Sequence, residues 1–374
     1  MRVLIFGTYD VAAHPRVGII AEGLRVAGHE VRECNAPLGF DTAARVRMLA
    51  QPWRVPALGV RLARCWARLV RQAMRGPRPD VVVVGYLGHF DVHLARLLFR
   101  RRRVVLDHLI GAADTGRDRQ VGQGIRQPVL RAIDAAALGA ARIVVVDTEE
   151  HREALPAKHR ERAVVVPVGA PGEWFAQESG SKLESESESE SESESAGGPL
   201  RVVFYGLFTP LQGAATIGTA IARLAGRPVE FTMVGAGQDK AEALRNAGDA
   251  TAVTWHDWIP AADLPRLVAA HDVCLGIFGT GPKALRVVPN KVYQGAAAGC
   301  AIITSDTPPQ RRALGDAARY VPPGDADALA AAIAELAERP ERLAELKHAA
   351  STAARERFTP RTIVEPLLAK LAEL

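Results

Sequence analysis

The chain has 374 residues, of which 48% are hydrophobic, with 47 Lys and Arg against 42 Asp and Glu. This length exceeds what one hydrophobic core usually serves, so two domains are expected. No segment approaches the roughly 20 consecutive apolar residues that span a bilayer, which argues against an integral membrane protein. The first apolar run, at residues 3–6, is too short for a signal peptide, and a cytoplasmic protein is expected.

The four cysteines are far apart in the sequence. No two of them have the spacing of metal ligands or of a redox pair. We therefore expect neither a disulfide framework nor a zinc site, and we interpret all four as small buried hydrophobic residues: Cys34, Cys65, Cys274 and Cys300.

A Ser-Glu repeat divides the chain and holds six of its 42 acidic residues, from Glu184 to Glu194. It has no apolar side chains to bury, so residues 176–198 are predicted to form a flexible tether, either natural or engineered. The predicted domains are an amino-terminal domain at 1–175 and a carboxyl-terminal domain at 199–357, followed by a last helix at 358–374.

Apolar runs of strand length alternate with helix-period segments on both sides of this repeat. The alternation predicts an α/β fold with two doubly wound, Rossmann-like domains facing a central cleft, and a C-terminal helix that packs back across their junction. In the first half, strands are expected near residues 2–6, 80–85, 104–107, 143–147 and 164–168, and helices near 17–27 and 91–99. In the second half, strands are expected near 200–205, 228–234, 272–277 and 301–304, and helices near 214–224, 261–270, 291–298, 325–337 and from Pro360 to Leu374.

Two nucleotide-binding signatures are missing from the sequence. A dinucleotide fold carries Gly-x-Gly-x-x-Gly at its first strand-to-helix turn, but Gly7 stands alone, and Gly235 and Gly237 have no third glycine. No P-loop sequence occurs either. A nicotinamide enzyme and a P-loop NTPase are therefore disfavoured.

Five ordered motifs together resemble the retaining, GT-B-fold glycosyltransferases of family four. They are VGAPGEWF at 168–175, VVFYGLFTPLQG at 202–213, FTMVGAGQ at 231–238, WIPAADLPRLVAAHDVCLGIF at 258–278 and PNKVYQGAAAGCAIITSD at 289–306. The resemblance covers the carboxyl half and, more loosely, the amino half through Gly7 and GHEV at 28–31. It implies that a sugar moves from a nucleoside diphosphate sugar to an acceptor with retention of configuration, by front-face attack.

The resemblance also sets the expected partners of the reaction. The acceptor would be lipid-linked, a saccharide or a secondary metabolite, bound mainly by the amino-terminal domain. No cofactor and no divalent metal are expected, because the sequence has no paired-acid loop to bridge a metal to the phosphates.

The donor site is expected in the second domain. Backbone N–H groups at a helix amino terminus, together with a cation, suit a diphosphate. Pro289, Asn290 and Lys291 open a helix after a strand and a loop, with Lys283 and Arg286 just upstream. The alternative is a routine first-turn proline beside a solvated loop. The motifs add the glycine turns, which could instead be only turns, and a neighbouring amide: Gly206, Gly213, Gly235, Gly237 and Gln212.

The sequence departs from the family pattern at this site in two places. Residues 207–212 lack the Arg and Lys that commonly contact the diphosphate, which shifts that role to Lys283, Arg286 and Lys291. Arg286 and Gln294 occupy the places of a Glu-x7-Glu pair that contacts the donor sugar and the ribose. Gln294 could still bond ribose hydroxyls. Arg286 either pairs with a carboxylate on the sugar or replaces the missing cations at the diphosphate, and we favour the second.

Candidate catalytic residues of the first domain are Asp107 and His108, because the resemblance places a histidine after a central strand, near the transferred sugar. The alternative is a buried structural pair. In the loop after Gly7, His14 and Arg16 could face the acceptor or the phosphates, although His14 could equally be only a loop residue.

Residues 54–75 predict an amphipathic helix whose arginines share one edge, at Arg61, Arg64, Arg68, Arg71 and Arg75. Such a helix could lie on the inner face of an anionic membrane, or it could be only an arginine-rich surface helix. Nucleic-acid binding is disfavoured, since no matching motif accompanies the basic composition. Two further functions stay open: a nucleotide-sugar epimerase of similar fold and a non-catalytic nucleotide-sugar-binding partner.

Overall fold

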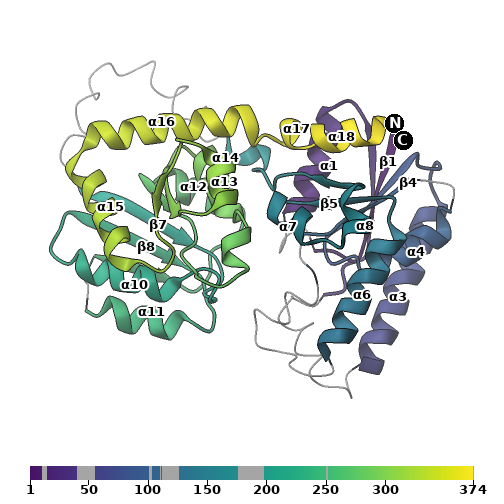
Figure 1. The fold of residues 1–374 in the computed structure, drawn as a ribbon, viewed down its shortest axis with the longest axis horizontal. Helices are drawn as coiled ribbons and strands as arrows, with labels where there is room; N and C mark the ends of the chain where they lie inside the picture. Colours follow the sequence, from purple (N-terminus) through teal and green to yellow (C-terminus); the bar gives the residue numbers. More distant parts are fainter. Residues whose placement is uncertain are drawn as a thin grey trace. The chain divides into compact units, whose positions relative to one another are not determined.

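The computed structural model describes residues 1–10, 15–39, 55–100, 103–109, 111, 126–175, 198–249 and 252–373. They form two compact units, Met1–Pro167 with Pro360–Leu374 and Val168–Thr359. Each unit holds a six-stranded parallel sheet with helices packed against it (Figure 1). The predicted α/β class with two doubly wound sheets is confirmed. The tether predicted at 176–198 lies outside the described residues, apart from Gly198.

The first unit has the strand order β2-β1-β3-β4-β5-β6. Its central strands are continuous apolar runs, such as VVVV in β3, because a parallel sheet is covered on both faces. The order reverses beside β1, so that the carboxyl ends of β1 and β3 border a switch point. The elements are β1 (Arg2–Gly7), α1 (Arg16–Val26), β2 (Glu30–Asn35), α3 (Val55–Met74), β3 (Val81–Val84), α4 (Asp91–Leu98), β4 (Arg103–Asp107), α6 (Arg126–Ala140), β5 (Ile143–Val146), α7 (Glu149–Ala154), α8 (Ala157–Arg160) and β6 (Ala163–Val165).

The last residues of the chain belong to this first unit. Their predicted single helix is wrong, because it is divided into α17 (Pro360–Ile363) and α18 (Glu365–Ala372). Pro366, in the first turn of α18, has no N–H with which to continue a helix from α17. Arg103 Nη1 donates to Leu371 O over 2.7 Å, which ties α18 to β4. A Cβ on Gly23 of α1 would lie 1.9 Å from Pro360 O, so α17 needs this glycine.

The second unit has the strand order β12-β11-β10-β7-β8-β9. The chain runs from β7 outward to β9 and then returns to β10 on the other side of β7, which places the switch point between β7 and β10. The elements are η2 (Gly172–Trp174), β7 (Leu200–Tyr205), α10 (Ala214–Arg223), β8 (Val229–Val234), α11 (Lys240–Ala247), β9 (Val253–His256), α12 (Leu264–Ala269), β10 (Val273–Leu275), η3 (Ala284–Arg286), α13 (Asn290–Ala297), β11 (Ala301–Ser305), α14 (Pro308–Leu314), β12 (Arg319–Val321), α15 (Ala326–Glu338) and α16 (Pro340–Arg357).

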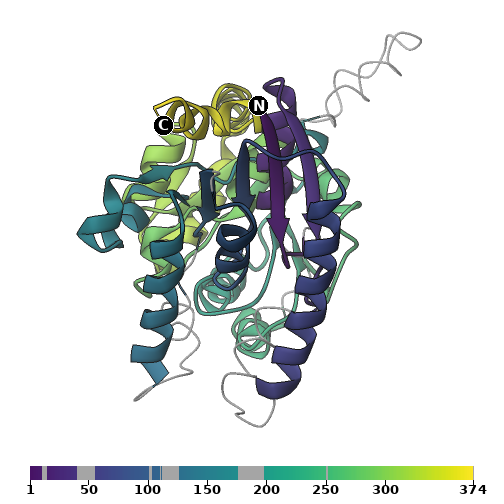
Figure 2. The same cartoon turned by 90° about the vertical axis from the view of Figure 1, so that its right-hand side faces the viewer.

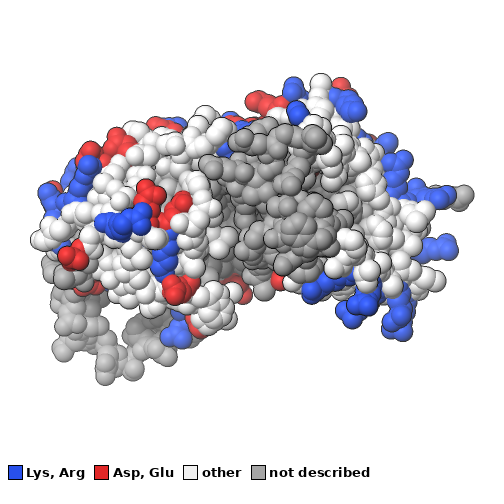
Figure 3. All heavy atoms as spheres, turned by 90° about the horizontal axis from the view of Figure 1, so that it is seen from below, with Lys and Arg blue, Asp and Glu red and all other residues white. Residues whose placement is uncertain are grey.

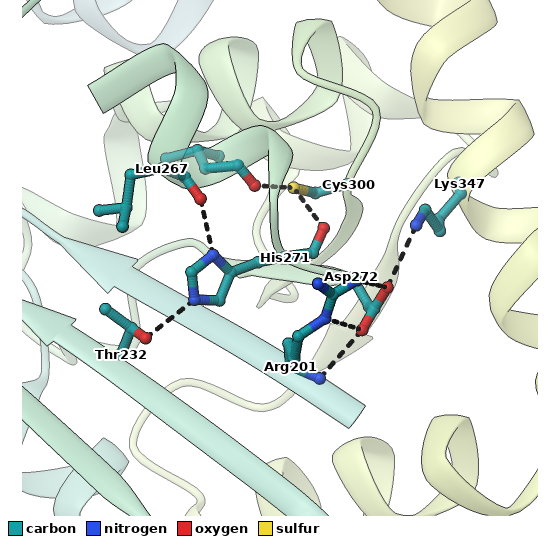
Figure 4. Close-up of polar contacts among 8 residues, drawn as sticks. Arg201, Thr232, Leu267, His271, Asp272, Cys300 and Lys347 are labelled. Atoms are coloured by element: carbon teal, nitrogen blue, oxygen red, sulfur yellow. Dashed lines mark hydrogen bonds and ion pairs between the residues drawn. The ribbon is translucent and has the colours of Figure 1, made fainter. Parts of the chain in front are cut away.

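A polar cluster fixes the amino edge of this second sheet (Figure 4). Asp272 accepts from the backbone N–H of Arg201 over 3.0 Å and from Lys347 of α16 over 3.3 Å. His271 Nδ1 lies 2.7 Å from Leu267 O, which can only accept, so Nδ1 donates and Nε2 accepts from Thr232 over 2.8 Å. These groups satisfy one another, and the cluster is explained by folding alone.

All four cysteines are buried and free, as predicted. In the described part of the chain, no helix combines the length and the apolar composition needed to cross a membrane.

Candidate active site

Lys291 lies at the switch point of the second sheet. It is in the first turn of α13, where Pro289 serves as the extended N-cap residue and Asn290 begins the helix. Its Nζ donates to Gln212 Oε1 over 2.6 Å and lies 3.6 Å from the centroid of the Phe204 ring. The fold thus joins the start of α13 to the end of β7 and to the loop that follows it.

The environment of Lys291 is unusual for a cation. The side chain is buried, and both partners just named are neutral. Burial lowers the pKa of its amine to about 7, since desolvation penalises the charged form. An anion arriving beside this amine would favour the charged form and raise that pKa.

Four glycines shape the loops around Lys291. A Cβ on Gly206 would lie 3.3 Å from Lys291 Nζ, so this glycine leaves room for the amine. A Cβ on Gly235 would lie 1.9 Å from Gly206 O, and one on Gly237 would lie 2.3 Å from Phe208 O. Gly213 is left-handed, with φ 68°, and caps α10. Packing inside the protein accounts for these glycines before any ligand is considered.

Gln294 lies one turn after Lys291 on α13. Its Oε1 accepts from the hydroxyl of Tyr205 over 3.0 Å, and the amide nitrogen is the group of this side chain that can donate. Burial raises the pKa of Tyr205 well above its ordinary value, so the hydroxyl stays a neutral donor. The Tyr205 ring stacks on Trp174, with centroids 5.9 Å apart.

The remaining donor-site candidates lie on the loop between β10 and α13. Lys283 caps the short helix η3, and Arg286 ends it. Arg286 Nε donates to Pro282 O over 2.9 Å, which anchors the guanidinium beside its own turn. Both side chains are half-buried. Trp258, which sequence reasoning did not select, lies two residues after β9 and is 74% exposed. Because β9 was not predicted from the sequence, the position of Trp258 after a strand was not apparent.

In the first unit, Asp107 is paired inside the protein. Arg16 Nε lies 2.9 Å from Asp107 Oδ1, with both side chains almost fully buried, and Arg16 Nη2 donates to Val166 O over 2.9 Å. Burial raises the pKa of Asp107, and the guanidinium opposes that shift. This ion pair links α1, the end of β4 and the segment after β6. Arg16 is therefore an interior residue in the structure.

His108 follows Asp107 and is buried against a second histidine. Its ring makes a T-shaped contact with His89, with centroids 5.4 Å apart, and His89 Nε2 lies 3.0 Å from Asp134 Oδ1 on α6. Burial, with a smaller contribution from His89, lowers the pKa of His108 to about 4, so the ring is neutral at neutral pH. His108 Nδ1 is buried and has no hydrogen-bond partner among the residues that the structure describes.

A further carboxylate–histidine contact lies at the carboxyl ends of these strands. His151 Nδ1 lies 2.5 Å from Asp147 Oδ1, where Asp147 directly follows β5 and His151 is on α7. Sequence reasoning missed this pair, as it missed His89 and Asp134.

The loop after Gly7 is held by Asp91. The Asp91 carboxylate accepts from the backbone N–H of Thr8 over 2.7 Å, and a Cβ on Gly7 would lie 3.2 Å from the same oxygen. His14 lies outside the described residues. Among the residues that are described, no three or more His, Cys, Asp or Glu side chains are grouped to hold a metal ion.

Comparison with known proteins identifies a family domain in the second half of the chain. Residues 199–339 match the model of Glycosyl transferases group 1. No curated protein matches the chain. Among solved structures, sucrose-phosphate synthase from Thermosynechococcus elongatus is similar, with 18% identity, a TM-score of 0.69 and coverage of 100% of this chain and 98% of the other.

Two other solved structures show the same likeness over both whole chains. The α,α-trehalose-phosphate synthase (UDP-forming) from Burkholderia vietnamiensis has 15% identity and a TM-score of 0.68. Anabaena Alr3699/HepE in complex with UDP-glucose has 15% identity and a TM-score of 0.65. At such identities the likeness establishes the fold, and the family match covers only part of the chain. The chain has the GT-B fold, and residues 199–339 of its second unit carry a glycosyltransferase domain of the Glycosyl transferases group 1 type.

Proposed function

We propose that this glycosyltransferase transfers a sugar from a nucleoside diphosphate sugar to an acceptor with retention of anomeric configuration. The observation that carries the proposal is Lys291, a buried amine with neutral partners at the switch point of the second sheet. Open parallel sheets bind ligands at that point. A buried amine whose pKa is about 7 gains most from a ligand that brings negative charge.

The diphosphate would lie against the first turn of α13. Its oxygens would accept from backbone N–H groups of that turn and from Lys291, which would take up a proton as the ligand binds. Gly206 keeps the space beside the amine open. Lys283 and Arg286, on the neighbouring loop, would supply the charge that residues 207–212 lack.

The nucleoside would extend from this turn towards Gln294. Because Tyr205 holds the amide oxygen, the amide nitrogen would donate to a ribose hydroxyl. The exposed indole of Trp258 would offer a stacking surface for the base. The solved relative Alr3699/HepE is in complex with UDP-glucose, which supports a nucleotide sugar as the donor here.

His108 is the residue of the first unit that we propose beside the transferred sugar. Being neutral, its imidazole would exchange hydrogen bonds with sugar hydroxyls rather than act as a charged acid. Asp107 and Arg16 would act as positioning residues, because their ion pair is closed inside the fold. The leaving diphosphate would be the base that accepts the acceptor's proton, and no divalent metal is part of the proposal.

The acceptor classes expected from the resemblance stay open: a lipid-linked molecule, a saccharide or a secondary metabolite. We also propose a cytoplasmic location, since four free cysteines suit a reducing compartment.

The test is incubation with a panel of UDP, GDP and TDP sugars and acceptors of these three classes, with and without EDTA. The expected result is a glycoside whose anomeric coupling in the NMR spectrum matches that of the donor, formed equally well in EDTA. An epimerised free sugar nucleotide would instead identify an epimerase. Tight binding with neither transfer nor hydrolysis would identify a non-catalytic binding partner, an alternative favoured by the cations missing from residues 207–212.

A further inference from the structure

A three-helix layer of the first unit presents a basic outer surface. Helices α3, α4 and α6 lie next to one another over the first sheet (Figure 2). Their inner sides carry buried apolar residues such as Leu69, Val92 and Leu138, which pack in one core with the strands. Their outer sides are exposed, and they are described here as the α3–α4–α6 face.

Positive charge dominates this face. The acids within residues 55–100 and 126–142 are engaged elsewhere: Asp80 forms an ion pair with Arg2, Asp91 is buried and bonded to Thr8, and Asp134 faces His89. Lys and Arg predominate where the first unit is drawn, at the right of Figure 3. The exposed arginines on or directly after these helices are Arg64, Arg68, Arg71, Arg75, Arg96, Arg100 and Arg131.

Large apolar side chains are exposed between these arginines. Met74 of α3 is 78% exposed, and Val60, Leu97 and Val129 are each more than half exposed. On α3, Val60, Arg64, Ala67, Arg71 and Met74 follow one another in steps of three or four, which places them along one side of the helix. The outer side of α3 therefore alternates guanidinium groups with apolar or small residues.

We propose that the α3–α4–α6 face docks onto an anionic lipid surface. Guanidinium groups pair with lipid phosphates, and apolar side chains between them enter the headgroup region, which is how an interfacial amphipathic helix binds. A second copy of the chain fits the face poorly, because two such surfaces would repel each other. A nucleic-acid backbone would satisfy the arginines and leave the exposed Met74, Val60, Leu97 and Val129 in water.

The test is co-sedimentation of the full chain with phosphatidylcholine vesicles, with and without about one third phosphatidylglycerol, at about 0.05 M and about 0.5 M salt. Binding is expected to the anionic vesicles at low salt only. Arg64, Arg68 and Arg71 are then changed to Glu together. Each cation near an anionic surface gives about a fivefold gain in affinity, so their loss predicts a weakening of about a hundredfold or more.

A matched variant carries the same change of charge elsewhere. Lys158→Glu, Arg245→Glu and Arg266→Glu alter exposed positions outside the face and should retain most of the binding. Circular dichroism and the melting temperature establish that both variants are folded, and Met74→Ser with Val60→Ser measures the apolar contribution. Absence of vesicle binding at low salt overturns the proposal, as does an equal loss in the two charge-reversal variants. Weaker binding to anionic vesicles than to an oligonucleotide of equal charge also overturns it in favour of nucleic acid.

Discussion

Lys291 Nζ lies 2.6 Å from Gln212 Oε1, so that the first turn of α13 is hydrogen-bonded to the loop between β7 and α10. Because Gln212 is neutral, this hydrogen bond does not balance the positive charge of the buried amine. A diphosphate that replaces or joins Gln212 would supply the missing negative charge. Much of the chemistry proposed for the second unit depends on this one contact.

We predict that donor binding is linked to proton uptake by Lys291. Burial places the pKa of the free protein's amine at about 7, and a bound diphosphate raises it. Affinity for UDP should therefore fall as the pH rises from about 7 to 9, with less than one proton taken up. Calorimetry in buffers of different ionisation enthalpy measures the number of protons taken up on binding.

The Lys291→Met variant should bind UDP at least tenfold more weakly at pH 7 and lose this pH dependence, while Arg245→Ala, at an exposed position of α11, should keep it. A pH dependence that survives in Lys291→Met would assign the proton to another group.

Two glycines at this site should respond differently to alanine. In Gly235→Ala the new Cβ would lie 1.9 Å from a backbone oxygen, which cannot move without displacing the loop, so a loss of several kcal/mol is expected. In Gly206→Ala the nearest atom is the flexible end of Lys291, at 3.3 Å, so UDP affinity should fall while stability drops less.

Gly226→Ala is the control for these two variants. It has a positive φ of 78° and nothing near its Cβ, and it should cost about 1 kcal/mol. Chemical denaturation ranks the three. Equal losses of stability in the three variants would show that the cost comes from the backbone conformation alone and not from the contacts of the new Cβ.

The buried pair of Arg16 and Asp107 gives a third prediction. Removing one partner leaves an uncompensated buried charge, which costs about 3–5 kcal/mol. Arg16→Met should therefore destabilise the first unit strongly, and adding Asp107→Leu to it should recover part of the loss. If the double variant is as unstable as the sum of the two single variants, the pair is not coupled as the 2.9 Å contact indicates.

The sequence predicted interior strands better than edge strands. β3 and β5 are short valine-rich runs that are buried on both faces, and such runs stand out from their neighbours. The edge strands β2, β9 and β12 were not predicted, because partial exposure lets them carry polar residues, as in EVRECN of β2. A strand could therefore be predicted where it is buried on both faces, whatever the strand propensity of its residues.

The candidate site shows the same division between local and distant information. Lys291 became a candidate because it opens a helix after a strand, and Gln294 because the resemblance places a ribose-contacting residue there; both relations are visible along the chain. The contact of His89 with Asp134, and the burial of Arg16 against Asp107, join separate elements and depend on how the sheet brings those elements together. No local pattern in the sequence indicates them.

The burial of His108 should make the folded protein less stable in acid. Its pKa in the folded protein is about 4, below the ordinary 6.5, so the unfolded chain binds more protons between those values. Stability is therefore complete above pH 6.5 and is lost as the pH falls towards 4, by on the order of 3 kcal/mol. His108→Gln should remove most of this loss, which thermal melts at a series of pH values would measure.

The same His108→Gln variant should lower turnover far more than UDP affinity, since the imidazole is proposed beside the sugar. His348→Ala, at an exposed position of α16, should change neither quantity. Equal losses of turnover and affinity would make His108 a structural residue.

The last prediction concerns whether Arg286 contacts the diphosphate or the sugar of the donor. Its guanidinium is anchored to its own turn through Pro282 O. Arg286 precedes Gln294 by eight residues, which include the extended Pro289 and the start of α13. If it clamps the diphosphate, as we favour, Arg286→Glu should weaken the binding of UDP, neutral sugar nucleotides and uronic acid nucleotides alike, by at least tenfold. Salt should partly screen this effect.

If Arg286 faces the sugar, a uronic acid nucleotide should outcompete its neutral counterpart on the unmodified protein, because a guanidinium pairs with a carboxylate through two hydrogen bonds. The substitution should then invert that preference and spare UDP. Competition binding of matched donors to both proteins distinguishes the two, and a uniform loss would retire the acidic-sugar reading.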